Sequence, residues 1–88
     1  MNLSHAELTD GAFNYTQKYM NQKELGHYEK LQMLSCAYAH LYLKAAQQAD
    51  AKSLGDAHTL IADCFQLLGD QVWAGKHKEV ASSYFKRG

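Results

Sequence analysis

Hydrophobic residues recur along this chain at the three- and four-residue spacing of amphipathic helices, and no strand-length run alternates with a period of two. The first helix is predicted from Ser4 to about Gln22, because Ser4 and Glu7 have the spacing of a capping box. Asp10 before Gly11 offers an alternative start for this helix. Its apolar face is expected to carry Leu8, Ala12, Tyr15 and Tyr19.

A long central helix is predicted from about residue 24 to residue 49, and it has apolar residues on two sides. The main stripe, which we assign to the core, consists of Leu31, Leu34, Tyr38, Leu41, Tyr42 and Ala45. A second stripe lies nearly opposite and consists of Met33, Cys36, His40 and Leu43. A helix that touches the core along one edge carries charges on its other side, so this helix is expected to be covered on both sides.

The rest of the chain is expected to form one or two further helices. A break is predicted at 53–56, and an apolar face follows at Ala57, Leu60, Ile61, Cys64, Phe65 and Leu68. Gly69 is predicted to end this helix and Asp70 to cap the last one, whose face contains Trp73, His77, Val80, Ala81 and Tyr84. If the third helix instead continues through Gly69, the turn moves to Gly75.

These patterns predict an all-α fold: a small antiparallel bundle of three to four helices, with residues 1–88 forming a single helical domain. The absence of proline suits long helices with short breaks. Apolar residues make up 47% and charged residues 20% of the chain, which is the balance of a globular protein rather than a disordered one. A chain of 88 residues has a small core, so association with another surface is expected.

Large and small residues near the C-terminus are spaced similarly to those of a tetratricopeptide helical hairpin. They are Phe65, Leu68, Gly69, Val72, Ala81 and Phe85. The resemblance covers only about residues 62–88 and does not recur 34 residues upstream, whereas a solenoid needs about three repeats. It implies a helix that runs through Gly69 and turns at Gly75, and it assigns the chain to no family.

Two classes of chemistry find little support in the sequence. Cys36 and His40 are one helical turn apart, so both side chains could reach the same metal ion. A four-coordinate site would need two more ligands from among His58, Asp63 and Cys64. Neither a paired CxxC nor HExxH is present, so a metal-binding helical protein is only a remote alternative, and no cofactor is expected. The chain has neither GxSxG nor a phosphate-binding glycine loop, so we expect a protein without enzymatic activity.

Nucleic-acid binding is the alternative function, because the charge is unevenly distributed. Residues 1–70 carry five lysines and eight carboxylates, whereas residues 71–88 carry four basic residues and one carboxylate. The basic residues of this last segment are the candidate phosphate contacts: Lys76, Lys78, Lys86 and Arg87. A helix-turn-helix centred on Gly69 is not indicated, because Phe65 and Gly75 occupy positions that call for a small residue and an aliphatic one.

The leading hypothesis is a non-enzymatic protein-interaction module, such as a small helical regulator, adaptor, chaperone or inhibitor. Six tyrosines, one tryptophan and three methionines are many for this length, and such residues favour interfaces. The second stripe has too few helices to cover it in a monomer, so a homodimer or a heteromeric complex is expected. The interface candidates are Met33, Cys36, His40, Leu43, Tyr15 and Tyr19.

The expected compartment is the cytoplasm. No run of apolar residues is long enough to span a membrane, and the first ten residues lack the basic and then apolar pattern of a secretory signal. Cys36 and Cys64 stand alone in the sequence, so both are expected to be reduced thiols.

Overall fold

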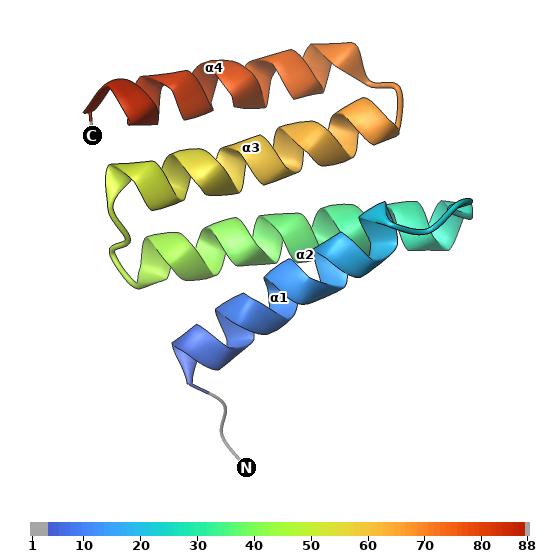
Figure 1. Ribbon diagram of the computed structural model, residues 1–88, viewed down its shortest axis with the longest axis horizontal. Helices are drawn as coiled ribbons and strands as arrows, with labels where there is room; N and C mark the ends of the chain where they lie inside the picture. Colours follow the sequence, from blue (N-terminus) through green and yellow to red (C-terminus); the bar gives the residue numbers. More distant parts are fainter. Residues whose placement is uncertain (1–3, 88) are drawn as a thin grey trace.

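The structure is a computed structural model that describes residues 4–87. It contains four helices, α1 (His5–Met20), α2 (His27–Ala46), α3 (Ala51–Leu67) and α4 (Gln71–Arg87), and the described residues form no strand (Figure 1). The all-α fold predicted from the sequence is therefore confirmed, with four helices rather than three.

The N-terminus of α1 is fixed by the predicted capping box. The Glu7 amide donates to the Ser4 hydroxyl at 3.1 Å, and the Ser4 amide donates to the Glu7 carboxylate at 3.4 Å. Two amides that would lack partners in the first turn are thereby satisfied. The alternative start at Asp10 is wrong, because Asp10 lies inside the helix.

The central helix is shorter at both ends than the predicted range of 24–49. Gly26 is its N-cap and Gln47 its C-cap. The helix that follows begins before the predicted break at 53–56, because the Asp50 carboxylate accepts a hydrogen bond from the Ser53 amide at 2.8 Å and caps it. An aspartate at this position stabilises a helix start as well as serine does.

The turn between α3 and α4 lies at Gly69, as the sequence predicts. Gly69 has a φ of +80°, a conformation that glycine adopts without steric cost. The Asp70 amide donates to the Phe65 carbonyl at 2.9 Å, and the Asp70 carboxylate accepts from the Trp73 amide at 3.1 Å. The alternative turn at Gly75, which the tetratricopeptide resemblance implies, is wrong, because Gly75 lies inside α4.

The four helices form an open array. Each helix packs chiefly against its neighbours along the chain; α2, α3 and α4 lie side by side, and α1 crosses one face of α2 (Figure 1). The molecule measures 38 × 34 × 15 Å, so it is thin in one direction. Its buried hydrophobic core is small and rich in alanine: Met33, Ala37, Ala57, Leu60, Ile61, Ala62, Cys64, Ala74 and Ala81.

Candidate interaction surface

The second stripe of α2 faces α1 within the same chain. Met33 is 0% exposed and His40 8% exposed, while Cys36 and Leu43 are half-buried. The prediction that a single chain cannot cover this stripe is wrong, because α1 lies across α2 instead of beside it (Figure 1). Met33 therefore offers no surface to a partner in this fold, and His40 offers only a small part of its ring.

Small polar residues let α1 approach α2 closely. Thr9 and Thr16 are both buried, and each hydroxyl donates to a carbonyl one turn earlier in α1. The Thr9 hydroxyl also accepts a hydrogen bond at 2.6 Å from the side chain of Gln47, the C-cap residue of α2. The Phe13 ring lies 5.5 Å from the His40 ring, centroid to centroid. Of the two interface candidates on α1, Tyr19 packs against the core, and Tyr15 is exposed.

His40 is held in one orientation by the backbone of α1. Its Nδ1 lies 3.3 Å from the Thr9 carbonyl, which can only accept, so Nδ1 carries the proton of the neutral ring. Burial lowers the pKa of His40, and Lys44 lowers it further, against the opposing effects of the Thr9 carbonyl and Asp10. An open pocket of about 260 Å³ beside the ring is lined by Asp10, Phe13, His40, Lys44, Ser53 and Asp56.

The main stripe of α2, which the sequence assigns to the core, is only partly covered. Leu34 and Leu41 pack against the core, but Leu31 is 52% exposed and Tyr42 72% exposed. The prediction that α2 has two apolar sides is correct. The side predicted to form the core is partly exposed, however, and the side predicted to need a partner lies under α1. Both sides have the helical period, so periodicity alone does not tell which one neighbouring helices cover.

An aromatic cluster extends across α2, α3 and α4 on the face of the array turned away from α1. We define it as Tyr38, His58, Phe65, Trp73, His77 and Tyr84. His77 lies at its centre, with ring centroids 5.5 Å from Tyr38, 5.2 Å from His58 and 5.8 Å from Phe65. Trp73 stacks on Phe65 at 6.2 Å, and Tyr84 on His58 at 5.7 Å.

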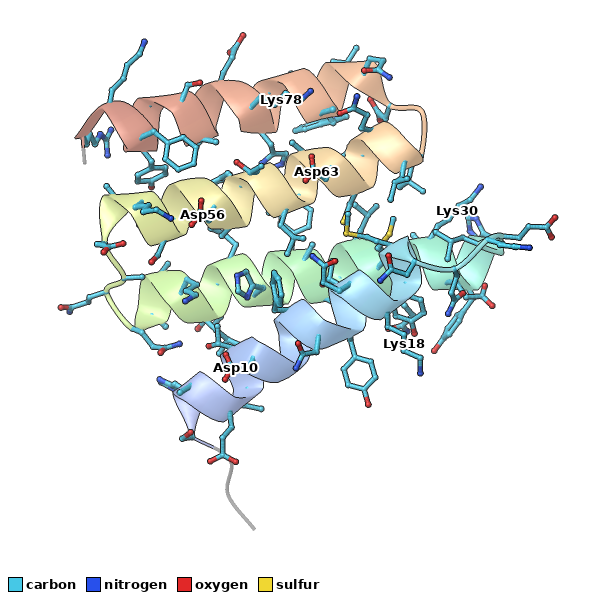
Figure 2. All side chains as sticks on the ribbon, viewed as in Figure 1. Asp10, Lys18, Lys30, Asp56, Asp63 and Lys78 are labelled. Carbon is cyan, nitrogen blue, oxygen red and sulfur yellow. The ribbon has the colours of Figure 1, made fainter. Side chains whose placement is uncertain are left out.

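Helical geometry places this cluster opposite α1. His58 and Phe65 each follow an aspartate by two residues, which is a rotation of about 200° around α3. Those aspartates, Asp56 and Asp63, line pockets together with residues of α1, and Figure 2 shows them on the α1 side of the array. The carboxylates of α3 and its aromatic rings therefore lie on opposite faces.

Hydrogen bonds link three members of the aromatic cluster. Tyr38 Oη lies 2.8 Å from His77 Nε2, and His77 Nδ1 lies 3.0 Å from His58 Nδ1. One of the two Nδ1 atoms must donate and the other accept, so the arrangement admits two neutral rings or one charged ring, but not two charged rings. Burial lowers the pKa of both histidines, and the proximity of His77 lowers that of His58 further. Burial also raises the pKa of the Tyr38 hydroxyl.

The four basic candidates of the C-terminal segment do not form one patch. Lys76 Nζ lies 4.6 Å from the centroid of the Trp73 ring, and the Arg87 guanidinium lies 5.1 Å from that of Tyr84, so both flank the aromatic cluster. Lys78 instead donates to the Gln66 side chain at 3.1 Å on the α1 side (Figure 2). Lys86 lines a pocket that also contains Glu79. The positive charge is therefore divided between two faces.

The proposed metal ligands are not brought together. Cys36 and His40 lie on the α1 side of α2, whereas His58 belongs to the aromatic cluster on the other face. Among residues 4–87, no group of three or more histidines, cysteines or carboxylates is placed to hold a metal ion. Both cysteines are free thiols, and burial raises the pKa of Cys64 to about 12.

The sequence does not indicate the aromatic cluster as a unit. It predicts Trp73, His77 and Tyr84 on one face of the last helix, and the structure brings all three into the cluster. Tyr38 and His77, however, are 39 residues apart and on helices that are not neighbours along the chain, so no local spacing indicates their contact.

None of the helices in the described part of the chain is long and apolar enough to cross a membrane. Comparison of the sequence with known protein families and with characterised proteins, and of the fold with solved structures, finds no match.

Proposed function

We propose that this protein is a protein-interaction module that binds through the face turned away from α1. The observation that supports this most directly is the aromatic cluster, which lies on the open face of an array that is only 15 Å thick. Trp73 is 47% exposed, and Tyr42 beside the cluster is 72% exposed. Large aromatic side chains that remain accessible are typical anchors of protein interfaces.

The distribution of charge favours a protein partner over a nucleic acid. Strands of nucleic acid bind to grooves that combine stacking aromatics with a track of positive charge. Here the aromatics are present, but Lys76 and Arg87 lie at the α4 edge of the face, and Lys78 is bonded on the opposite side. The expected partner surface is apolar or aromatic, with carboxylates facing the two edge cations.

Binding through this face is tested first by protein capture with variants of the two faces, and then by the fluorescence of Trp73, which is the single tryptophan and lies in the aromatic cluster. Proteins captured from the host by the wild-type chain are compared with those captured by two variants. Val80→Glu places a charge between Lys76 and Tyr84, each one turn away on α4. Leu67→Glu is the control, because Leu67 is 56% exposed and lies on the α1 side.

A protein retained by the wild type and by Leu67→Glu but lost with Val80→Glu is expected. That protein, once purified, should shift the Trp73 emission to shorter wavelength and protect it from quenching, because a partner removes water from the ring. If all three baits capture the same proteins, the proposal fails. If single-stranded oligonucleotides quench Trp73 with a steep salt dependence, the nucleic-acid alternative replaces it.

A further inference from the structure

The exposed side of α2 carries a second pattern, which extends beyond the main stripe. From Tyr28 to Ala45 the residues turned away from α1 are separated alternately by three and four positions: Tyr28, Leu31, Ser35, Tyr38, Tyr42 and Ala45. We call this set the heptad stripe. A mean spacing of 3.5 residues is the repeat with which one helix packs against another in a coiled coil.

The heptad stripe is exposed in the single chain. Tyr28 is 67% exposed, Leu31 52%, Tyr42 72% and Tyr38 39%. The hydroxyl groups of two of these residues already have partners, since Tyr28 accepts from Gln32 and Tyr38 contacts His77. Their rings are thus held in place while part of each ring remains open to a partner.

The positions that flank the heptad stripe are uncharged. On one side they are His27, Leu34 and Leu41, and on the other Gln32, Ala39 and Ala46. In coiled coils these flanking positions usually hold the charges that select or reject a partner helix. Nothing at these positions repels an identical helix, and the chain as a whole has a formal net charge of zero.

The order of large and small residues determines the direction of pairing. When two copies of α2 run antiparallel, Tyr28 faces the partner's Ala45, Leu31 faces the partner's Tyr42, and Ser35 faces the partner's Tyr38. Each of these layers combines a larger residue with a smaller one. A parallel pair would instead place tyrosine on tyrosine in three layers and leave gaps at serine and alanine, which is unfavourable in a close-packed interface.

We propose that the heptad stripe binds the heptad stripe of a second copy of this chain, forming an antiparallel two-fold dimer through α2. The inference rests on the proposed function in that it names the partner for one part of the same face. The three tyrosines of the heptad stripe expose about 350 Å² per copy, taking about 200 Å² for each whole ring. This is nearly half of the roughly 800 Å² per partner that a stable interface buries.

The test is sedimentation of the full chain between about 1 and 100 µM, a range that reveals mass-action dissociation. The wild type is expected to sediment at twice the mass of the chain. Leu31→Glu should weaken the dimer by about 100-fold or more, because it buries a carboxylate without a partner. Leu67→Glu, a leucine of similar exposure on the α1 side, should leave the dimer unchanged. Circular dichroism checks that each variant keeps its helix content.

A charge-pair rescue tests the register. Tyr42→Lys alone should also dissociate the dimer, but Leu31→Glu combined with Tyr42→Lys should restore it, because antiparallel pairing brings each new carboxylate to the partner's new ammonium group twice per dimer. Parallel pairing would bring like charges together and give no rescue, so a failed rescue overturns the antiparallel register.

A wild-type chain that stays monomeric throughout this range, or a dimer insensitive to Leu31→Glu, would overturn the pairing itself. Selective loss of a captured protein with Val80→Glu would still support the proposed function in that case. The failure of one proposal is therefore distinguishable from the failure of the other.

Discussion

At the scale of single residues, three histidines occupy environments that favour their neutral form. His40 is enclosed between α1 and α2, and His58 and His77 stack in the aromatic cluster. In all three cases burial is the first cause of a lowered pKa. Protonation is therefore expected to loosen both the contact between α1 and α2 and the face opposite to it.

Replacing His40 tests the pH dependence. Because the folded pKa of His40 is lowered from its ordinary value of 6.5, the unfolded chain binds more protons than the folded one as the pH falls from just above 6.5 through the folded pKa. The free energy of unfolding should therefore fall between about pH 8 and pH 5. Urea denaturation of His40→Gln should show a smaller fall than the wild type.

Tyr15→Phe, an exposed change on α1 that removes no imidazole, provides the control for this experiment and should follow the wild-type curve. If His40→Gln loses as much stability on acidification as the wild type does, His40 is not a source of the pH dependence.

At the scale of the element, α2 is the helix on which the rest of the array depends. One of its sides is buried under α1, and the adjacent side packs against α3 through Leu34 and Leu41. The remaining side, the heptad stripe, faces solvent in a single chain. The function that we propose therefore depends on which apolar side of α2 is left uncovered by the other helices of the same chain.

Alanine substitutions on opposite sides of α2 test this assignment. Met33→Ala should destabilise the fold by about 3 kcal/mol, because the side chain is fully buried and leaves a cavity. Leu31→Ala should cost less than about 1 kcal/mol, because half of that side chain is already exposed. Denaturant unfolding at low protein concentration measures both values. Equal losses, or a larger loss at Leu31, would contradict the assignment of the two sides.

At the scale of the whole molecule, the array is held together by close contacts between neighbouring helices, several of them at small residues. The clearest is Gly55 of α3, which is buried beneath the ring of Phe85 from α4. A Cβ placed on Gly55 would lie 2.5 Å from that ring. Any side chain at Gly55 must therefore displace Phe85 or move the two helices apart.

A double-mutant cycle measures this contact. Gly55→Ala should destabilise the wild type by about 1 kcal/mol, because the added methyl overpacks the contact by more than alanine gains in helix propensity. In a Phe85→Ala background the same change should become stabilising by about 1 kcal/mol, since the obstacle is gone. Gly11→Ala, whose Cβ would meet nothing within 4 Å, should be stabilising in both backgrounds. An unchanged effect of Gly55→Ala in the two backgrounds would show that Phe85 does not restrict this position.

Local sequence chemistry accounts for the existence of the helices and for most of their ends. Helix starts at Ser4 and Asp70 and the stop at Gly69 follow from local chemistry, because caps and a positive φ depend on residues only a few positions apart. The start of α3 is not determined in this way. Asp50 and Ser53 are both residue types that cap helices, and the structure shows that Asp50 is the cap. The sequence does establish that α2 has apolar residues on two sides.

Which of those two sides is buried follows from the packing of the helices. The path of α1 across α2 covers Met33 and His40 and leaves Tyr42 exposed, and that path depends on packing between residues more than 20 positions apart. The same holds for the aromatic cluster, whose members come from three helices. Hydrophobic burial is non-directional, so an amphipathic pattern marks a surface to be covered, whereas the geometry of the assembled helices determines what covers it.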